Sequence, residues 1–528
     1  MQRPLGAQIS HMLKDRGVRV IFGIPGVHNQ EMYRGIEEAG IKHVLARHEQ
    51  GAGFMADGYA RATGAPGVAY VITGPGLCNI MTPMGQAYSD SVPMLVISSC
   101  LDETAARKGQ LHQMKDQRGA AETVCDWSHE ARTPEAAYTL IDRALTEFRT
   151  QRPRPKHIQV PISVLEALAP PPPARLASTA RLPKVADMHI HEVKTHLDRA
   201  RAPLIILGGG HKGAGMRALK VADNVGAAMF TTYAGRGLVP DDHPRCFGAM
   251  LARPESAEVL AKADVVLIVG SEMAQGDLWR DQLGGSGTVI RVDIDSVTLT
   301  DGINAEHHYQ YDACLFMSVL AHATKDCTPA VKWRPEEVAQ TRKRWREQVR
   351  TERPGIVEVA DALRAATSDD TMIYSDMTQF AYAAKEIWPM SRSHHWHHPT
   401  GFGTLGYALP AAIGGAMMRR GHETMAIIGD YGFHYTMAEL GVAVELGLPL
   451  PIILWDNGKL KEIEDSMTRA QIAPNAVVAR NPDFCKLAEA FGAYAAAPQS
   501  LGEMQAAVQK AFKADGPTLI YLTPDITA

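Results

Sequence analysis

The residues that decide the fold run Ile427-Ile428-Gly429-Asp430-Tyr431-Gly432 and, a helix-length later, Ile453-Leu454-Trp455-Asp456-Asn457. Each group is a short apolar run that ends abruptly in polar residues, and an amphipathic segment over residues 436–447 lies between them. This order predicts a strand, a loop, a helix, a second strand and a second loop. Neighbouring parallel strands end at the same edge of a sheet, so we expect both loops to open at one edge.

Oxygen ligands gather at that predicted edge. Asp430 and Asn457 carry the carboxylate and amide oxygens that suit Mg²⁺ bound to a diphosphate. An ordinary Rossmann-like turn with a solvated aspartate is the alternative for the first loop taken alone.

Together the loops resemble the cofactor motif of thiamine diphosphate enzymes of the acetolactate synthase and 2-oxo acid decarboxylase superfamily, which usually reads Gly-Asp-Gly and then Asn-Asn. The spacing from Asp430 to Asn457 is that of the motif. Tyr431 stands in place of the Gly that follows the Asp, and Asp456 stands in place of the first Asn. The resemblance implies that Asp430, Asn457 and the backbone carbonyl of Lys459 hold Mg²⁺.

The family motif also implies cofactor contacts for Tyr431 and Gly432. The added carboxylate at Asp456 either strengthens Mg²⁺ binding or repels the diphosphate. A protein of this fold without catalytic activity is therefore one of the alternatives.

Composition excludes several classes of partner. The chain has 528 residues and a formal charge of −4, which gives no basic field for nucleic acid and no attraction to an anionic membrane. Seven scattered cysteines without a Cys-x-x-Cys pair indicate reduced thiols. With no signal-peptide core at the first residues, we expect a cytoplasmic protein.

Four consecutive prolines within residues 169–175 predict a linker. Short β-branched runs at 204–207 and 263–270 alternate with helical stretches, which indicates βαβ units. The fold class predicted is α/β, with three doubly wound parallel-sheet domains. They span residues 1–168, 186–328 and 350–528, and the resemblance implies that they are the pyrimidine-binding, middle and diphosphate-binding domains. Similar segments at 154–161 and 516–522 suggest that the outer two domains are related.

Glu49 lies at the end of a predicted strand and before a helix rich in Ala and Gly, whose small residues let another surface approach closely. A carboxylate at a helix start is commonly there for the helix dipole. The surrounding sequence resembles the family's first-domain signature, which implies that Glu49 bonds to N1′ of the aminopyrimidine and is catalytic.

The glycine-rich run at 401–412 resembles the family loop around the aminopyrimidine. The resemblance implies that the carbonyl of Gly403 accepts the 4′-amino group, that Leu405 props the cofactor in a bent shape, and that Thr378 and Gln379 reach the diphosphate. Because Glu49 and these residues belong to different domains, and the family bridges them across two chains, we expect a homodimer or a homotetramer with active sites between chains.

Two further loops resemble family loops that face the thiazolium, one with Pro25 and His28 and one with Asn79. His112 and Gln113 fall where relatives carry polar groups that handle protons of the bound intermediate. A solvated or structural role is the alternative for each histidine. A run of histidines within 394–398 raises a metal hypothesis, but adjacent side chains cannot all point one way.

The resemblance implies a thiamine-diphosphate- and Mg²⁺-dependent lyase that decarboxylates a small 2-oxo acid to an aldehyde and CO₂. The stretches around residues 23–28 and 47–61 are most similar to the 5-guanidino-2-oxopentanoate (2-ketoarginine) decarboxylase branch. The guanidinium tail of that substrate would need acidic partners, and Glu462, Glu464 and Asp465 are the candidates. The alternative for these three acids is a solvated, charged helix start. An acetolactate synthase-like carboligase is the main alternative, and FAD or ADP in the middle domain stays open. A nicotinamide-dependent oxidoreductase is a more distant alternative, because the glycine turn at 208–210 lacks the full Gly-x-Gly-x-x-Gly fingerprint of nicotinamide binding.

Overall fold

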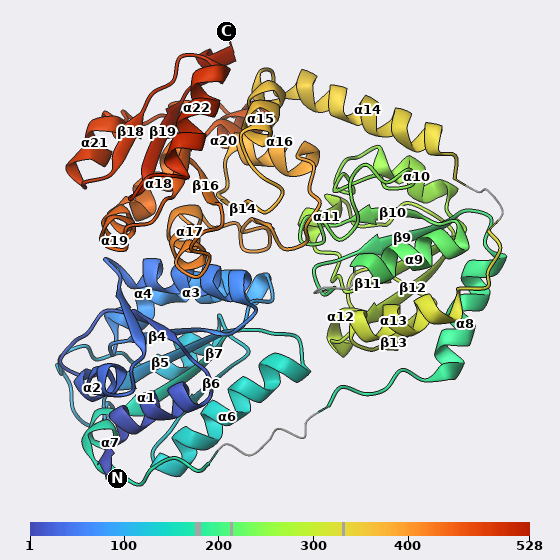
Figure 1. Cartoon of the computed structure of the whole chain (residues 1–528). Helices are drawn as coiled ribbons and strands as arrows, with labels where there is room; N and C mark the ends of the chain where they lie inside the picture. The colour runs from blue at the N-terminus through green and yellow to red at the C-terminus, as the bar shows by residue number, and fades with distance from the viewer. Residues whose placement is uncertain (175–180, 212–214, 330–332, 528) are drawn as a thin grey trace.

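The computed structural model describes residues 1–174, 181–211, 215–329 and 333–527. Two sequence expectations therefore extend outside the described residues, at Arg175 in the predicted linker and at Ala528 in the last predicted domain. The described chain forms three α/β bodies, each built on its own parallel sheet (Figure 1). The predicted fold class is confirmed.

The first body holds a six-stranded parallel sheet of order β3-β2-β4-β5-β7-β6. The short strands β1 and β8 pair antiparallel beside it. Its strands are β1 Arg3–Pro4, β2 Val20–Gly23, β3 Lys42–Leu45, β4 Gly67–Val71, β5 Met94–Cys100, β6 Trp127–Glu130, β7 Lys156–Pro161 and β8 Leu168–Ala169. Its helices are α1 Leu5–Asp15, α2 Gln30–Glu38, α3 Glu49–Thr63, α4 Pro75–Ser89, α5 Gln117–Glu122, α6 Pro134–Thr150 and α7 Ile162–Glu166.

The third body holds a six-stranded parallel sheet of order β15-β14-β16-β17-β19-β18. Its strands are β14 Met372–Ser375, β15 Trp396–His397, β16 Thr424–Gly429, β17 Pro451–Trp455, β18 Tyr494–Ala496 and β19 Thr518–Leu522. Its helices are α15 Ile356–Ala365, α16 Gln379–Ile387, α17 Ala408–Ala416, α18 Asp430–Thr436, α19 Leu440–Glu445, α20 Lys461–Arg469, α21 Phe484–Ala490 and α22 Leu501–Ala511, with 3₁₀ turns η1 Met437–Glu439 and η2 Pro524–Thr527.

The two outer sheets share one topology. In each, the strands stand in the order second, first, third, fourth, sixth and fifth along the chain. The segments whose similarity suggested related domains form the sixth strand in both, β7 and β19. These strands lie inside their sheets, which explains their apolar character.

The middle body holds a five-stranded parallel sheet of order β10-β9-β11-β12-β13. Its strands are β9 Pro203–Leu207, β10 Ala228–Thr231, β11 Val265–Val269, β12 Thr288–Asp293 and β13 His307–Gln310. Its helices are α8 Asp187–Arg199, α9 Gly215–Val225, α10 Ser256–Lys262, α11 Gln275–Leu278, α12 Ser296–Thr300 and α13 Ala313–Ala323. The charged helix α14, Pro335–Glu352, then leads to the third body.

Helix α17 of the third body lies on α3 of the first (Figure 1). The backbones approach closely, because a Cβ atom at Gly58 would lie 1.9 Å from the carbonyl oxygen of Ala411 and one at Gly414 would lie 2.0 Å from that of Met55. The expectation that the small residues of this helix admit a close neighbour is confirmed. Apolar side chains of both bodies, including Phe54 and Tyr407, share one core cluster there.

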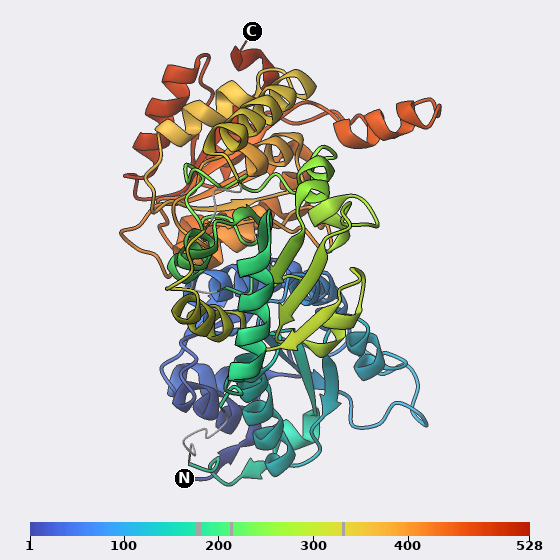
Figure 2. The same cartoon turned by 90° about the vertical axis from the view of Figure 1, so that its right-hand side faces the viewer.

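The middle body contacts both others through polar side chains, and it also shares an apolar core cluster with the third body. Arg152 of the first body pairs with Glu272 at 2.7 Å, and Arg253 pairs with Glu386 of the third at 3.0 Å. Figure 2 shows α20 projecting from the third body. Among the described residues, no helix combines the length and the apolar character that crossing a bilayer requires.

Candidate active site

The two polar segments that follow β16 and β17 meet at one sheet edge, as predicted. Strands β14, β16 and β17 are neighbours, and Gly429 at the end of β16 pairs with Trp455 at the end of β17. The next residues, Asp430 and Asp456, therefore lie side by side at the carboxyl edge. A third carboxylate, Asp376, directly follows β14 at the same edge.

The local structure at Asp430 differs from the sequence expectation. A loop was expected at 429–432 and a helix over 436–447, whereas α18 begins at Asp430 itself and ends at Thr436. A 3₁₀ turn and α19 follow. Gly429 has extended φ and ψ of −84° and 164°, so the chain passes from strand to helix without an intervening loop. The glycines that suggested a loop have a packing cause instead.

Asp376 supplies that cause at Gly432. A Cβ atom at Gly432 would lie 2.8 Å from Asp376 Oδ2, so a side chain has no room. The Asp376 carboxylate accepts the backbone N–H of Met377 and of Gly406, each at 2.8 Å, and is fully buried. Burial raises the pKa of Asp376 to about 7. This carboxylate joins the end of β14 to the glycine-rich loop and to α18.

The residues expected around the cofactor surround this junction. Gly403, at φ +70°, is exposed, and Leu405 is half-buried in the same loop. The hydroxyl of Thr436 donates to the carbonyl of Gly406 at 2.8 Å, which ties the loop to α18. Thr378 packs against Gly429, where an added Cβ would lie 3.0 Å from its Oγ1. Tyr431 is half-buried in the first turn of α18.

The expected metal ligands also lie here. Asn457 Nδ2 donates to Gln379 Oε1 at 3.3 Å, and Asn457 Oδ1 accepts the backbone N–H of Lys459 at 3.3 Å. Burial, followed by the neighbouring Asp456, raises the pKa of Asp430. Two carboxylates this close are the charge arrangement that a divalent cation relieves, so the donor set fits Mg²⁺.

Asn481 bridges the two carboxylates, a role that the sequence did not indicate. Its Nδ2 donates to Asp430 Oδ2 at 2.8 Å and to Asp456 Oδ1 at 3.0 Å. Asp456 Oδ2 accepts the hydroxyl of Tyr521 at 2.9 Å. Asp456 is thus held by protein donors. Asn481 lies 24 residues beyond Asn457 in a segment without regular structure, so no local pattern marks it.

Glu49 is the first residue of α3, and 8% of it is exposed. The predicted strand end and helix start are therefore confirmed. Asn79, on α4, donates its Nδ2 to Glu49 Oε2 at 2.9 Å. A Cβ atom at Gly76 would lie 3.4 Å from Glu49 Oε1. The carboxylate is thus oriented by one amide donor beside a glycine turn.

The histidines of the first body come together. The rings of His28 and His112 lie 4.9 Å apart, from the loops after β2 and β5, and His112 has a φ of +62°. Burial and His112 lower the pKa of His28. Pro25 is exposed on the same loop as His28. The side chain of Gln113 folds back onto its own loop, because its Nε2 donates to the carbonyls of Thr104 and Arg107 at 3.0 and 2.8 Å.

Glu439 is a further residue that sequence reasoning missed. It belongs to the third body, yet its Oε1 accepts the backbone N–H of Arg47 at 3.1 Å and of His48 at 2.9 Å, immediately before Glu49. Only 1% of Glu439 is exposed, and burial raises its pKa to about 7. A Cβ atom at Gly51 would lie 2.1 Å from Glu439 Oε1, so that glycine admits the carboxylate.

Within one chain, Glu49 and the glycine-rich loop contact different parts of α4. Glu49 contacts Asn79, whereas Thr404 donates to Gln86 Oε1 at 3.0 Å. Asn79 and Gln86 are separated by seven residues, about 10 Å along the helix. Gly401 N–H donates to Asp90 Oδ1 at 3.0 Å, still farther along. The described contacts of a single chain therefore keep the two halves of the expected site apart.

The run of histidines does not converge. His395 faces Asp370 at 3.6 Å, while His398 Nδ1 lies 2.9 Å from Ser375 Oγ. His397 and His398 are buried, and burial lowers the pKa of both well below the ordinary range. Their environment favours neutral structural side chains.

The acids proposed for a guanidinium tail already have basic partners. Glu462 pairs with Arg353, and Asp465 pairs with Lys461. Glu464 pairs with Lys459 at 3.0 Å. All three lie on α20, the projecting helix of Figure 2.

The glycine turn after β9 has a packing explanation. A Cβ atom at Gly208 would lie 2.1 Å from the carbonyl oxygen of Gly270, and one at Gly210 would lie 3.0 Å from Gly270 Cα. These glycines let the turns after β9 and β11 touch.

Three family models match the chain, one on each body. They are described as thiamine pyrophosphate enzyme, N-terminal TPP binding domain (residues 3–120), central domain (190–320) and C-terminal TPP binding domain (376–522). The matches follow the order of domains that the sequence resemblance implied.

Similar curated proteins span nearly the whole chain. The probable 2-ketoarginine decarboxylase AruI of Pseudomonas aeruginosa is 41% identical over 527 residues, covering 98% of this chain and 93% of that protein. The acetolactate synthase isozyme 1 large subunit of Escherichia coli is 27% identical over 546 residues, covering 99% and 94%. The acetolactate synthase large subunit of Lactococcus lactis is 28% identical over 498 residues, covering 91% and 85%.

Proposed function

The chain belongs to the thiamine pyrophosphate enzymes, and from this membership we propose that it decarboxylates 5-guanidino-2-oxopentanoate (2-ketoarginine) without oxidation, giving CO₂ and the corresponding aldehyde. The observation that carries the choice of substrate is the 41% identity, over 98% of the chain, to a probable 2-ketoarginine decarboxylase. The acetolactate synthases are 27% and 28% identical.

Thiamine diphosphate, when bound, supplies a nucleophilic carbon and accepts the electron pair released as CO₂ leaves. Asp430, Asn457 and the carbonyl of Lys459 would hold Mg²⁺. The fit is supported by the buried Asp430 carboxylate, its carboxylate neighbour and the adjacent amide oxygen of Asn457. Tyr431 and Gly432 would border the diphosphate, with Thr378 and Gln379 beside them.

Glu49 would hold the proton shared with the aminopyrimidine, on the carboxylate that Asn79 orients. The carbonyl of Gly403 would accept the amino group and Leu405 would support the ring. His28 and His112, with their rings 4.9 Å apart, are the groups we assign to proton transfer at the substrate. Gln113 would act by fixing the loop that carries His112, because its amide binds that loop's carbonyls.

The active unit would be a homodimer, or a homotetramer of two such dimers. Within one chain, Glu49 contacts Asn79 and the loop of Gly403 contacts Gln86 through Thr404, about two helical turns apart along α4. A second chain, facing the first, would bring the Glu49 half of one protomer to the Gly403 half of its partner. Measuring the molar mass at concentrations where activity persists tests this, and an active monomer would contradict it.

The guanidinium tail would need carboxylates that are free to receive it. Glu462, Glu464 and Asp465 fulfil this only by exchanging their present basic partners for the substrate. Charge-neutral variants of the three acids should raise KM for the guanidino acid and leave KM for an uncharged 2-oxo acid unchanged. Equal effects on both substrates would show that the acids only stabilise α20.

The test of the function is an NMR time course of the protein with thiamine diphosphate, Mg²⁺ and equal amounts of 5-guanidino-2-oxopentanoate and pyruvate. Conversion of the guanidino acid to its aldehyde supports the proposal. Acetolactate from pyruvate would instead place the chain with the carboligases. Flavin absorbance of the purified protein checks for FAD in the middle body, and nucleotide release on denaturation checks for ADP.

Glu49→Gln provides the matched control. It keeps the size of the side chain and can still accept from Asn79, so cofactor binding should persist while turnover falls by about 100-fold or more. Cofactor affinity is measured by calorimetry beside the NMR assay. Turnover close to that of the unaltered protein would remove Glu49 from the mechanism.

A further inference from the structure

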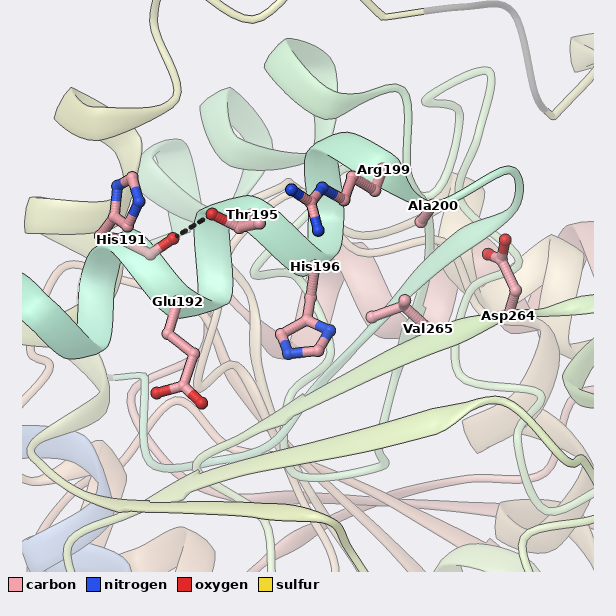
Figure 3. A pocket seen from close by; sticks show the side chains of 8 residues that line it. All are labelled: His191, Glu192, Thr195, His196, Arg199, Ala200, Asp264 and Val265. Atoms are coloured by element: carbon pink, nitrogen blue, oxygen red, sulfur yellow. Dashed lines mark hydrogen bonds between the residues drawn. The ribbon is translucent and has the colours of Figure 1, made fainter.

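A pocket of about 480 Å³ lies beside α8 in the middle body, away from both halves of the candidate active site. Glu192 and His196 line it, one helical turn apart. Figure 3 shows both side chains leaving α8 on the same side, whereas His191 points away from them.

A third side chain reaches these two from the sheet. His307 is the first residue of β13, and its Nδ1 lies 3.2 Å from Glu192 Oε1. The rings of His196 and His307 have centroids 4.6 Å apart. One possible ligand atom from each of the three residues lies within 4.8 Å of the other two.

We propose that Glu192, His196 and His307 form a binding site for a divalent transition-metal ion of the Zn²⁺ class, which joins α8 to the edge strand β13. Two imidazoles and one carboxylate are a donor set that such ions prefer over Mg²⁺. Water from the pocket would complete the coordination.

The geometry requires only small side-chain movements. Bonds to nitrogen and oxygen in a tetrahedral Zn²⁺ site place ligands roughly 3.3 Å apart, and the His307–Glu192 pair already has this separation. Exposed fractions of 43% for the Glu192 side chain and 26% for the His307 side chain leave room for rotation and for entry of the ion. The ring of His307 lies parallel to that of Tyr309, two residues farther along the same strand, with the ring centroids 6.5 Å apart.

Without a metal, His307 and Glu192 form an ordinary polar contact at the surface. The spacing of the three residues distinguishes this cluster from the other histidine run. Residues 394–398 are adjacent and diverge, as His395 and His398 show. Glu192 and His196 are spaced to share a helix face, and His307 approaches them from another element. Among the described residues, no second group of three or more His, Cys, Asp or Glu side chains is arranged closely enough to hold a metal.

The experiment uses the protein saturated with thiamine diphosphate and Mg²⁺, so that the oxygen ligands near Asp430 are occupied. Co²⁺ serves as the probe, because its visible absorption distinguishes a site with imidazole ligands from an all-oxygen site. We expect one Co²⁺ per chain with this absorption, displaced by Zn²⁺. His196→Ala and His307→Ala should each weaken binding by at least about tenfold, since even outer partners of a metal site contribute that much.

His191→Ala is the matched control, on the same helix and pocket but outside the cluster, and it should bind Co²⁺ as the unaltered protein does. Zn²⁺ should also raise the thermal midpoint of the unaltered protein and of His191→Ala, but not that of His307→Ala. The proposal is overturned if no such absorption appears, or if His196→Ala and His307→Ala bind Co²⁺ like the control. Circular dichroism at room temperature identifies any variant that has failed to fold.

Discussion

Removing the carboxylate of Glu439 should disturb the start of α3 and thereby the position of Glu49. In Glu439→Ala the N–H groups of Arg47 and His48 lose their acceptor, which now stands at 3.1 and 2.9 Å. Arg47 and His48 are exposed residues, so water can replace part of the contact; each lost hydrogen bond costs about 0.5–1.5 kcal/mol, and the two together about 1–3 kcal/mol. Both donors lie directly before the catalytic candidate, so kcat should fall more than KM rises.

The assay is hydrogen exchange of the peptide that covers residues 45–52, followed together with turnover. A loss of 1.4 kcal/mol corresponds to a factor of ten, so these amides should exchange about tenfold faster in Glu439→Ala. Glu445→Gln is the matched control, because Glu445 contacts the Arg47 side chain and is 59% exposed. An exposed ion pair contributes about 0–1 kcal/mol, and exchange of this peptide should hardly change.

The pH dependence of stability gives a second, independent test of the buried Glu439 carboxylate. Burial raises the pKa of Glu439 from 4.5 to about 7 in the folded protein. Between these values the folded state keeps a proton that the unfolded state releases, so this group's contribution to stability falls as the pH rises from 4.5 to 7. The shift corresponds to about 3 kcal/mol. Glu439→Gln cannot ionise, so its thermal midpoint should rise relative to the unaltered protein between pH 5 and pH 8.

The reasoning is refuted by either of two results. Unchanged exchange of residues 45–52 in Glu439→Ala would mean that the carboxylate does not hold these amides. A midpoint difference between Glu439→Gln and the unaltered protein that is constant with pH would mean that Glu439 titrates alike in both states.

Two further substitutions probe the diphosphate half of the site. Gly432→Ala would place a methyl group 2.8 Å from Asp376 Oδ2, so it should lower the free energy of unfolding by about 1–3 kcal/mol and weaken cofactor binding. The control is Gly502→Ala, in a helix with no atom within 4 Å of the added carbon, which should be neutral or stabilising. Calorimetry of cofactor binding and thermal midpoints check both variants. Asn481→Ala removes the donor shared by Asp430 and Asp456. A proton must leave Asp430 before Mg²⁺ binds, so Mg²⁺ affinity should fall with decreasing pH. Because the hydrogen bond from Asn481 lowers the pKa of Asp430, the fall should begin at higher pH in this variant. Identical pH profiles of the two proteins in Mg²⁺ titrations would argue against this.

Several features followed from the sequence because they depend on neighbours along the chain. Apolar runs that end at Gly429 and Trp455 form buried parallel strands, so the residues after them had to meet at one edge. The run of Ala and Gly after Glu49 marked a helix that a neighbour could approach closely, and α17 is that neighbour.

Other features required the tertiary structure, because they depend on contacts between distant segments. Asp376 occupies the space beside Gly432, which explains the glycine that had suggested a loop where α18 begins. Asn481 and Glu439 hold Asp430 and the approach to Glu49, although neither lies within a recognisable motif. Burial and through-space hydrogen bonding set these roles, and neither quantity is encoded in local residue order.

The same distinction separates the two groups of histidines. The run at 394–398 passes from a turn at His394 into the short strand β15, and its side chains do not converge, as the separate partners of His395 and His398 show. Glu192 and His196 share a helix face by their spacing, which the sequence alone contains. That His307 meets them was decided only by the packing of α8 beside the edge strand β13, because helix and strand are more than a hundred residues apart.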